Sequence, residues 1–173
     1  MKTKILTILA LLVSIGTVLH FVMPPLLFGV KPDMMLAMMF LGIILFPKWN
    51  YVILLAFATG AISALTTAAP GGQIANLIDK PLTAVAFFLL FLLVRKQMNT
   101  KVTASVLTFA GTLISGSIFL SVALFFLGFL EGGFLALFAA VVLPAAVMNT
   151  VIMLVVYPIV EGIMKRSKVA AVS

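Results

Sequence analysis

The sequence predicts an all-α integral membrane protein, a single domain over residues 1–173 that folds as a bundle of six transmembrane helices. Hydrophobic residues make up 64% of the chain, and its mean hydropathy is +1.35. Charged residues make up only 9%, whereas a soluble domain carries about 25%. Prolines, glycines and charge clusters divide the apolar sequence into six runs, and a bilayer core of about 30 Å needs about 20 helical residues in each.

The six runs define the expected membrane spans. They cover about residues 5–28, 33–47, 50–68, 80–95, 102–128 and 134–163. The first run follows Lys2 and Lys4, as in a signal peptide, but it continues to about Phe28 without a small-residue cleavage site, so we interpret it as a span. The second run is short, which suits a helix shielded by protein. The last run is long and contains Pro144, so we expect a tilt or a kink.

Basic residues predict the orientation of this bundle. With six spans both termini lie on one side, and that side holds nine of the eleven lysines and arginines: Lys2, Lys4, Lys48, Arg95, Lys96, Lys101, Lys165, Arg166 and Lys168. The other side holds Lys31 and Lys80, together with Asp33, Asp79 and Glu131. By the positive-inside rule both termini are cytoplasmic. The net charge of +7 then reflects membrane topology and not binding to nucleic acid.

The first span and the loop after it offer several candidate contacts, each with a simpler explanation. Ala10 and Ser14 lie one helical turn apart and let another helix approach closely, which serves packing within this protein equally well. His20 is either a ligand contact or a partner for a neighbouring loop. Lys31 and Asp33 either bind a ligand or are interface charges, with Asp33 capping the second helix.

A polar stretch between the third and fourth spans contrasts with the rest of the chain. Gln73, Asn76, Asp79 and Lys80 follow at helical spacings of three and four, so in a helix they lie within an arc of about 120°. Pro70-Gly71-Gly72 predicts an irregular backbone before them, and Pro81 predicts the start of a helix. One anion, one cation and two amides suit the binding of a zwitterion on the extracytoplasmic side.

The last two spans carry polar residues among small ones. Thr108, Gly111, Thr112, Ser115 and Gly116 are part of a small-residue ridge in the fifth span, which favours close helix packing. Asn149 lies near the middle of the sixth span, where an unpaired amide is costly, so it faces the bundle interior. It either hydrogen-bonds a neighbouring helix or contacts a solute.

Several kinds of chemistry are excluded. The chain has no cysteine and a single histidine, so thiolate chemistry and a metal site built on them are absent. No nucleotide-binding loop, catalytic triad or pair of catalytic carboxylates is present, which predicts that the chain is not an enzyme and does not itself hydrolyse ATP. Asp33 and Glu161 lie only at the ends of the expected spans and no acidic residue lies in the interior of one, which argues against a proton-coupled carrier.

Six segments and one further residue together resemble one known family. They are Met1–Lys4, Ala10–His20, Lys31–Leu36, Ile62–Thr67, Gly72–Pro81 and Ala139–Val147, with Asn149. In these segments the chain resembles the substrate-binding S components of energy-coupling factor (ECF) transporters, closest to the bacterial tryptophan transport protein family. The resemblance implies a multi-pass protein of the bacterial plasma membrane that binds tryptophan near the outer surface. It also implies docking on an ECF transmembrane coupling protein and two ATPase subunits, which use the ATP, while this chain binds no cofactor.

The resemblance also implies roles for individual residues. Partner docking falls on Ala10 and on Ser14, which replaces the second alanine of the family's alanine-x-x-x-alanine pattern. The ligand carboxylate would meet Lys80 or Lys31, its ammonium Asp79 or Asp33, and its indole N–H Asn149 or Gln73, among walls with candidates Phe21, Phe28 and Phe119. The substrate-binding residues expected in all are His20, Lys31, Asp33, Gln73, Asn76, Asp79, Lys80 and Asn149.

Three alternatives stay open at this point. The chain is also compatible with a stand-alone ion-coupled amino-acid carrier or with an S component for another nutrient, such as a vitamin. A third alternative is a membrane subunit that transports nothing and uses the polar stretch to bind a partner protein. Binding of a small solute by the chain alone would disfavour the third alternative, and transport without an ATPase would favour the first.

Overall fold

The computed structural model describes residues 3–27, 29–95, 100–128 and 130–166, and no β-strand occurs within them. Its elements are α1 (Thr3–Val22), α2 (Met34–Leu45), α3 (Trp49–Thr66), α4 (Gly72–Val94), α5 (Thr100–Ser121), the π-helix η2 (Val122–Phe126), α6 (Phe134–Leu137), the π-helix η3 (Phe138–Val142) and α7 (Leu143–Arg166). The all-α prediction is confirmed. Lys2, Phe28, Lys96, Lys168 and the side chain of Lys101 lie outside what the structure describes.

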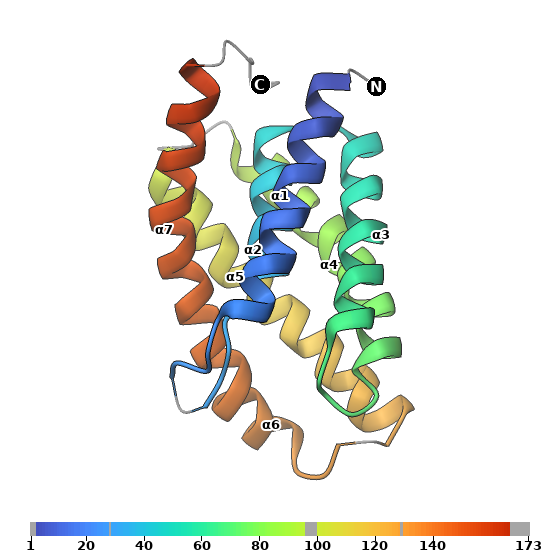
Figure 1. Ribbon diagram of the computed structural model, residues 1–173. Coiled ribbons are helices and arrows are strands. Elements are labelled where there is room, and N and C mark those ends of the chain that lie inside the picture. Colours follow the sequence, from blue (N-terminus) through green and yellow to red (C-terminus); the bar gives the residue numbers. More distant parts are fainter. Residues whose placement is uncertain (1–2, 28, 96–99, 129, 167–173) are drawn as a thin grey trace.

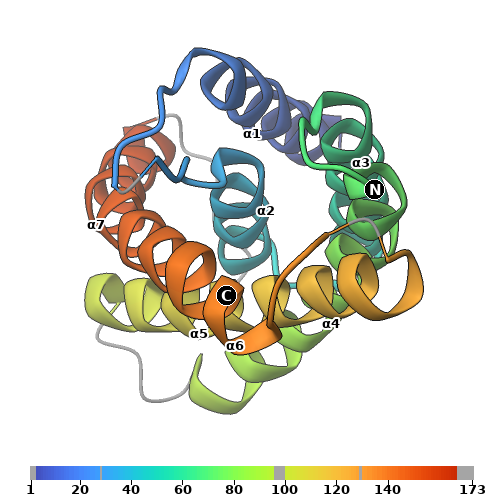
Figure 2. The ribbon, with the colours of Figure 1, turned by 90° about the horizontal axis from the view of Figure 1, so that it is seen from below.

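Helix α2 is the centre of the bundle. Figure 2 shows it surrounded by α1, α3, α4, α5 and α7, and it contacts all five. All 12 of its residues are buried, so its uniformly apolar sequence faces protein on every side. The expectation that the second apolar run forms a short, shielded helix is confirmed.

Five helices are long and apolar enough to cross a bilayer. They are Thr3–Val22, Trp49–Thr66, Gly72–Val94, Val102–Phe126 and Phe134–Arg166. Helix α2 is shorter, because its 12 residues extend only about 18 Å. The part of the chain that the structure describes therefore contains five helices of spanning length and one short central helix. The start of α1 and the end of α7 lie at the same end of the bundle (Figure 1).

The fourth helix begins earlier than the sequence suggests. Gly71 adopts a left-handed conformation with φ 69°, which ends the preceding turn, and α4 starts at Gly72. Pro81 therefore lies inside α4, and its prediction as a helix start is wrong. A proline inside a membrane helix is tolerated where neighbouring helices cover the freed backbone groups. Gly60 of α3 packs against the turn of α4 that contains Pro81. As a consequence Asp79 lies within a helix of spanning length, so the expectation of no acidic residue in a span is also wrong.

Two glycines of α5 confirm the expected close packing of this helix. A side chain at Gly111 would collide with Phe40 and Phe87, whose rings stack with centroids 3.9 Å apart. A side chain at Gly116 would collide with Val142 of η3. The irregularity expected near Pro144 takes the form of η3 itself, in which the Leu143 N–H bonds the Phe138 carbonyl five residues earlier.

Candidate ligand-binding site

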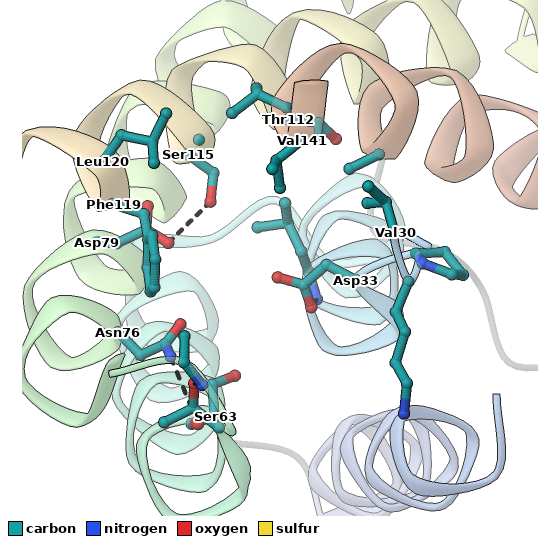
Figure 3. Close-up of a pocket in the computed structure, with 18 of the residues that line it drawn as sticks. Val30, Asp33, Ser63, Asn76, Asp79, Thr112, Ser115, Phe119, Leu120 and Val141 are labelled. Carbon is teal, nitrogen blue, oxygen red and sulfur yellow. Dashed lines mark hydrogen bonds between the residues drawn. The ribbon is translucent and has the colours of Figure 1, made fainter. Parts of the chain in front are cut away.

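A cavity of about 390 Å³ lies between the helices (Figure 3). The end of α1, the segment before α2 and the start of α4 contribute to its lining, and they lie at the end of the bundle opposite to the start of α1 (Figure 1). The cavity volume falls in the range of about 300–1,000 Å³ that is usual for small-molecule sites. Residues from α1, from the segment 30–36 and from α3, α4, α5 and η3 line it. Because these elements converge from distant parts of the sequence, the cavity exists only in the folded bundle.

The lining combines polar and apolar residues. Side chains from α2, α5, η3 and the chain before α7 supply the apolar wall, which includes Leu36, Phe119, Leu120, Leu130, Leu137 and Val141. Figure 3 shows Phe119, Leu120 and Val141 on the same side of the cavity as Ser115 and Thr112. Such a combination suits a ligand that has an apolar body and a few charged or hydrogen-bonding groups.

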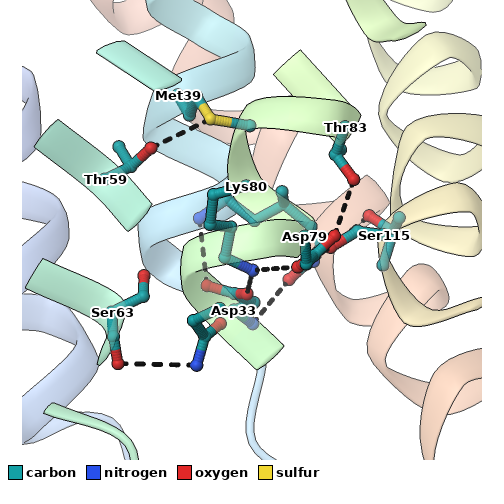
Figure 4. A network of polar contacts seen from close by, with 12 residues as sticks. Asp33, Met39, Thr59, Ser63, Asp79, Lys80, Thr83 and Ser115 are labelled. Atoms are coloured by element: carbon teal, nitrogen blue, oxygen red, sulfur yellow. Dashed lines mark hydrogen bonds and ion pairs between the residues drawn. The ribbon is translucent and has the colours of Figure 1, made fainter. Parts of the chain in front are cut away.

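A three-residue ion-pair network lies at the polar side of the cavity (Figure 4). The Nζ atom of Lys80 lies 2.7 Å from Oδ2 of Asp33 and 3.0 Å from Oδ2 of Asp79. The side chain of Lys80 is 3% exposed, that of Asp79 is fully buried, and that of Asp33 is 28% exposed. Two carboxylates against one ammonium give this network a formal net charge of −1, and Asp33 is its most exposed member.

Asp79 is fully engaged by protein groups. Besides Lys80, its Oδ2 accepts a hydrogen bond from the Ser115 hydroxyl at 2.8 Å, and its Oδ1 accepts one from the Thr83 hydroxyl at 2.7 Å. The bond from Ser115 ties α4 to α5, and the three bonds together supply the partners that a buried carboxylate requires. Asp79 therefore has a structural role in addition to lining the cavity.

Asp33 has two functions in the structure. Its Oδ1 accepts from the Leu36 N–H at 3.0 Å, so Asp33 caps α2 as the sequence predicts. Its Oδ2 accepts from Lys80. Burial alone would raise the pKa of this carboxyl, but the charge and hydrogen bond of Lys80, together with the Leu36 N–H, outweigh burial and hold that pKa below its ordinary value.

Asn149 stabilises the site although its side chain does not line the cavity. It is fully buried, its Oδ1 accepts from the Asp33 N–H at 3.0 Å, and its Nδ2 donates to the Thr112 hydroxyl at 3.2 Å. The amide therefore joins the start of α2 to α5 through α7. Of the two explanations given by the sequence, hydrogen bonding to neighbouring elements is confirmed, while contact with a solute stays a prediction.

Two buried polar atoms at the cavity have no hydrogen-bond partner within the described part of the chain. They are Nδ1 of His20 and Oγ of Ser63, and both residues line the cavity. Buried polar groups are nearly always paired, so an unpaired one beside a cavity indicates a place for a ligand or a water molecule. The exposed side chain of Lys31 also lines the cavity, on the same segment as Asp33.

The structure brings together six of the eight residues predicted to bind substrate: His20, Lys31, Asp33, Asn76, Asp79 and Lys80. Gln73 does not line the cavity, because it is exposed in the first turn of α4, about 10 Å along the helix from Lys80. Asn149 lies behind the lining. Of the three candidate wall residues, Phe119 lines the cavity, Phe21 is 64% exposed, and Phe28 is not described.

The polar lining also includes four hydroxyl residues outside the predicted substrate-binding set: Ser63, Thr67, Thr112 and Ser115. The sequence places Thr112 and Ser115 in the small-residue ridge of the fifth span, where packing alone explains them. Ser63 lies in α3, and Thr67 directly follows that helix. Small hydroxyl residues serve helix packing equally well, so the sequence does not single out these four as lining residues.

Ala10 and Ser14 are exposed on the outer face of α1 and do not line the cavity. They are therefore accessible to another protein, and their role in docking stays a prediction. Among the residues that the structure describes, no group of three or more His, Asp or Glu side chains is placed to hold a metal ion.

Comparison with known proteins gives consistent similarities over nearly the whole chain. The family model described as "Tryptophan transporter TrpP" matches residues 2–165. A probable tryptophan transport protein of Bacillus subtilis is 59% identical over 167 residues, covering 96% of both chains. Probable tryptophan transport proteins of Clostridium acetobutylicum and Clostridium perfringens are 38% and 37% identical, and each alignment covers at least 95% of this chain and 96% of the relative. No solved structure matches the chain significantly.

Proposed function

The chain belongs to the tryptophan transporter TrpP family, and from this premise we propose that it captures tryptophan in the cavity between α1, α3, α4, α5 and η3. As a member of a transport family with five helices of spanning length, it is a multi-pass protein of the bacterial plasma membrane and not an enzyme. The observation that carries the proposal is the cavity itself, in which an apolar wall faces charged groups and two unpaired polar atoms.

The ammonium of tryptophan binds Asp33 in this proposal. Asp79 is fully buried and accepts three hydrogen bonds from protein side chains, whereas the Asp33 carboxylate accepts two hydrogen bonds. Asp33 has a more exposed carboxylate, and the ion-pair network to which it belongs carries one net negative charge. A second ammonium beside Asp33 would neutralise that charge, which favours a zwitterion over an uncharged ligand.

The carboxylate of tryptophan binds Lys31 and His20. Lys80 also lines the cavity, but its ammonium already bonds two carboxylates. Lys31 is exposed and lies two residues before Asp33, so a charged group for each end of the zwitterion is available on one segment. His20 adds an unpaired ring nitrogen at the same cavity. The indole ring then lies against the apolar wall, where its burial supplies most of the favourable free energy.

The cavity opens to the extracytoplasmic side in the proposed topology. The start of α1 and the end of α7 lie at the opposite end of the bundle, which carries Lys4, Lys48, Arg95, Lys165 and Arg166. By the positive-inside rule this basic end is cytoplasmic. Tryptophan would therefore be captured from outside, with α2 contributing a sixth, internal helix to the bundle.

The chain acts in this proposal as the S component of an ECF transporter. The sequence contains no nucleotide-binding loop, so energy from ATP would have to come from partner subunits. The exposed small residues Ala10 and Ser14 on α1 support a docking surface for a coupling protein. The buried Asp79 in α4 is a reason to test the stand-alone ion-coupled carrier as well.

Equilibrium binding of radiolabelled tryptophan to the purified chain in detergent tests capture. We expect saturable binding that tryptophan analogues displace and that other amino acids and vitamins do not. Absence of binding in folded protein would refute the ligand assignment. Uptake into vesicles containing the chain alone then tests coupling, since an S component needs its ATPase partners, whereas a carrier responds to an ion gradient without them.

A further inference from the structure

Ser63 differs from its neighbours on α3 in how its hydroxyl is used. Thr59 donates to the Leu55 carbonyl at 2.6 Å, and Thr66 donates to the Ile62 carbonyl at 2.8 Å. This bond to the carbonyl four residues earlier is the ordinary way in which a membrane helix satisfies a hydroxyl. The Oγ of Ser63 has no partner among the described residues, although Ser63 is only 5% exposed and lines the cavity.

The other hydroxyls that line the cavity are already in use. Thr67 accepts from the Ala69 N–H at 3.2 Å, Thr112 donates to the Thr108 carbonyl at 2.8 Å, and Ser115 donates to Asp79 at 2.8 Å. A buried hydroxyl without a partner is unfavourable, and a ligand group that donates a hydrogen bond relieves the cost. Ser63 is therefore the hydroxyl of the lining that gains most from such a ligand.

Tryptophan carries one donor in its side chain, the indole N–H, which cannot accept. With its ammonium and carboxylate bound at the segment of Lys31 and Asp33, this N–H is the one polar group of the ligand still without a partner. We propose that Ser63 determines specificity by accepting a hydrogen bond from the indole N–H. This inference rests on the proposed function and adds the residue that distinguishes tryptophan from amino acids with purely apolar rings.

Hydrogen bonds next to Ser63 help to fix the side of the cavity on which Ser63 lies. Asn76 donates from Nδ2 to the Gly72 carbonyl at 2.8 Å and to the Ser63 carbonyl at 3.5 Å, which links α4 to α3 (Figures 3 and 4). A site that presents a buried acceptor rejects a ligand of the same shape that lacks the donor, because the acceptor then remains unpaired. In this proposal Ser63 distinguishes ligands with a hydrogen-bond donor on the ring from those without one, whereas the apolar wall distinguishes ligands by their shape.

The test compares tryptophan with β-benzothienylalanine, in which sulfur replaces the indole N–H, as competitors for radiolabelled tryptophan. We expect the parent protein to prefer tryptophan by on the order of tenfold or more. In Ser63→Ala the affinity for tryptophan should fall by on the order of tenfold, while that for the analogue stays unchanged. The preference then disappears. Melting of the ligand-free protein should not fall, because the Ser63 hydroxyl makes no bond among the described residues whose loss could destabilise the fold.

Two further variants make the result decisive. Ser117→Ala removes a hydroxyl that donates to the Leu113 carbonyl and does not line the cavity, so it should leave the preference intact. If Ser63→Ala retains the preference while Asn76→Leu loses it, Asn76 is the acceptor and the inference is overturned. Retention of the preference in Ser63→Ala refutes this inference alone, whereas failure of the parent to bind tryptophan refutes the proposed function as well.

Discussion

The Nζ atom of Lys80 lies 2.7 Å from Oδ2 of Asp33, a residue 47 positions earlier in the chain. The bond joins the interior of α4 to the residue that caps α2, and Lys80 also bonds Asp79 at 3.0 Å. A single ammonium thus fixes the central helix and the polar side of the cavity relative to each other. Its removal has consequences for both stability and binding.

Lys80→Met should destabilise the folded protein severely. The change leaves the fully buried Asp79 without its counter-charge, and breaking a buried ion pair from one side costs about 3–5 kcal/mol. Thermal unfolding in detergent measures the effect. The double variant Lys80→Met/Asp79→Asn should recover part of the loss, since no uncompensated charge then remains at position 79. Equal melting temperatures for the single and double variants would contradict this explanation.

Lys31→Gln should weaken tryptophan binding without unfolding the protein. Lys31 is exposed and lines the cavity, and loss of a charge-assisted hydrogen bond to the carboxylate should raise the dissociation constant by on the order of tenfold. Lys48→Gln is the matched control, because Lys48 is an equally exposed lysine between α2 and α3 that does not line the cavity. Equal affinities for the two variants would remove Lys31 from the site.

The ion pair of Asp33 should make stability depend on pH only under acid conditions. The pKa of Asp33 is lower in the folded protein than its ordinary value of about 4, so the carboxylate stabilises the fold above that value. This contribution is lost as the pH falls through the folded pKa. Melting of the parent and of Asp33→Asn should differ by a constant amount from pH 8 to pH 5, and the difference should shrink below about pH 4. A difference that shrinks near neutral pH would contradict the prediction.

Gly116→Ala should reduce both stability and tryptophan affinity. A methyl group at Gly116 would overlap the side chain of Val142, which lines the cavity from η3, and overpacking of this kind costs about 1–3 kcal/mol. Gly162→Ala provides the comparison, because nothing lies near the position of its new methyl group in α7. That variant should be neutral or stabilised by up to about 1 kcal/mol. Similar effects in both variants would exclude a role for the contact between α5 and η3.

Ser14→Leu should prevent transport while leaving tryptophan binding intact. Ser14 is exposed on α1, so leucine there disturbs no internal contact but prevents close approach of a partner helix. Uptake by whole cells and copurification with the coupling protein measure the effect. Val151→Phe, at an exposed position of α7, controls for added bulk on the bundle surface. Normal uptake by Ser14→Leu would locate the docking surface elsewhere.

The sequence predicted the helical class, and most of the residues that it assigns to substrate binding line the cavity, because both predictions depend on strong local signals. The apolar runs identify the helices, and the spacing of Asn76, Asp79 and Lys80 identifies the polar face of α4 that lines the cavity. The sequence does not predict the start of α4, because proline is common in the first turn of a helix and Pro81 instead lies inside α4, which begins directly after the left-handed Gly71.

The long-range partners could not be predicted. The bond of Asn149 to the Asp33 N–H joins residues 116 positions apart, and nothing in either local sequence encodes it. The same holds for Ser115, whose spacing fits a packing ridge until Asp79 of another helix is placed beside it. Sequence spacing shows which side chains share a helix face, but only the assembled bundle shows what each face meets.

Burial of every residue of α2 has a consequence for how the chain is inserted during synthesis. A helix of 12 residues reaches about 18 Å and is too short to be released into lipid as an independent span of about 30 Å. We therefore expect it to enter the bilayer together with its neighbours in the chain, α1 and α3, as one unit of three helices. Helices α4, α5 and α7 are synthesised after α2, so the apolar surface of α2 is fully covered only when they are present. We therefore expect the centre of the bundle to become stable only after synthesis of the chain is complete.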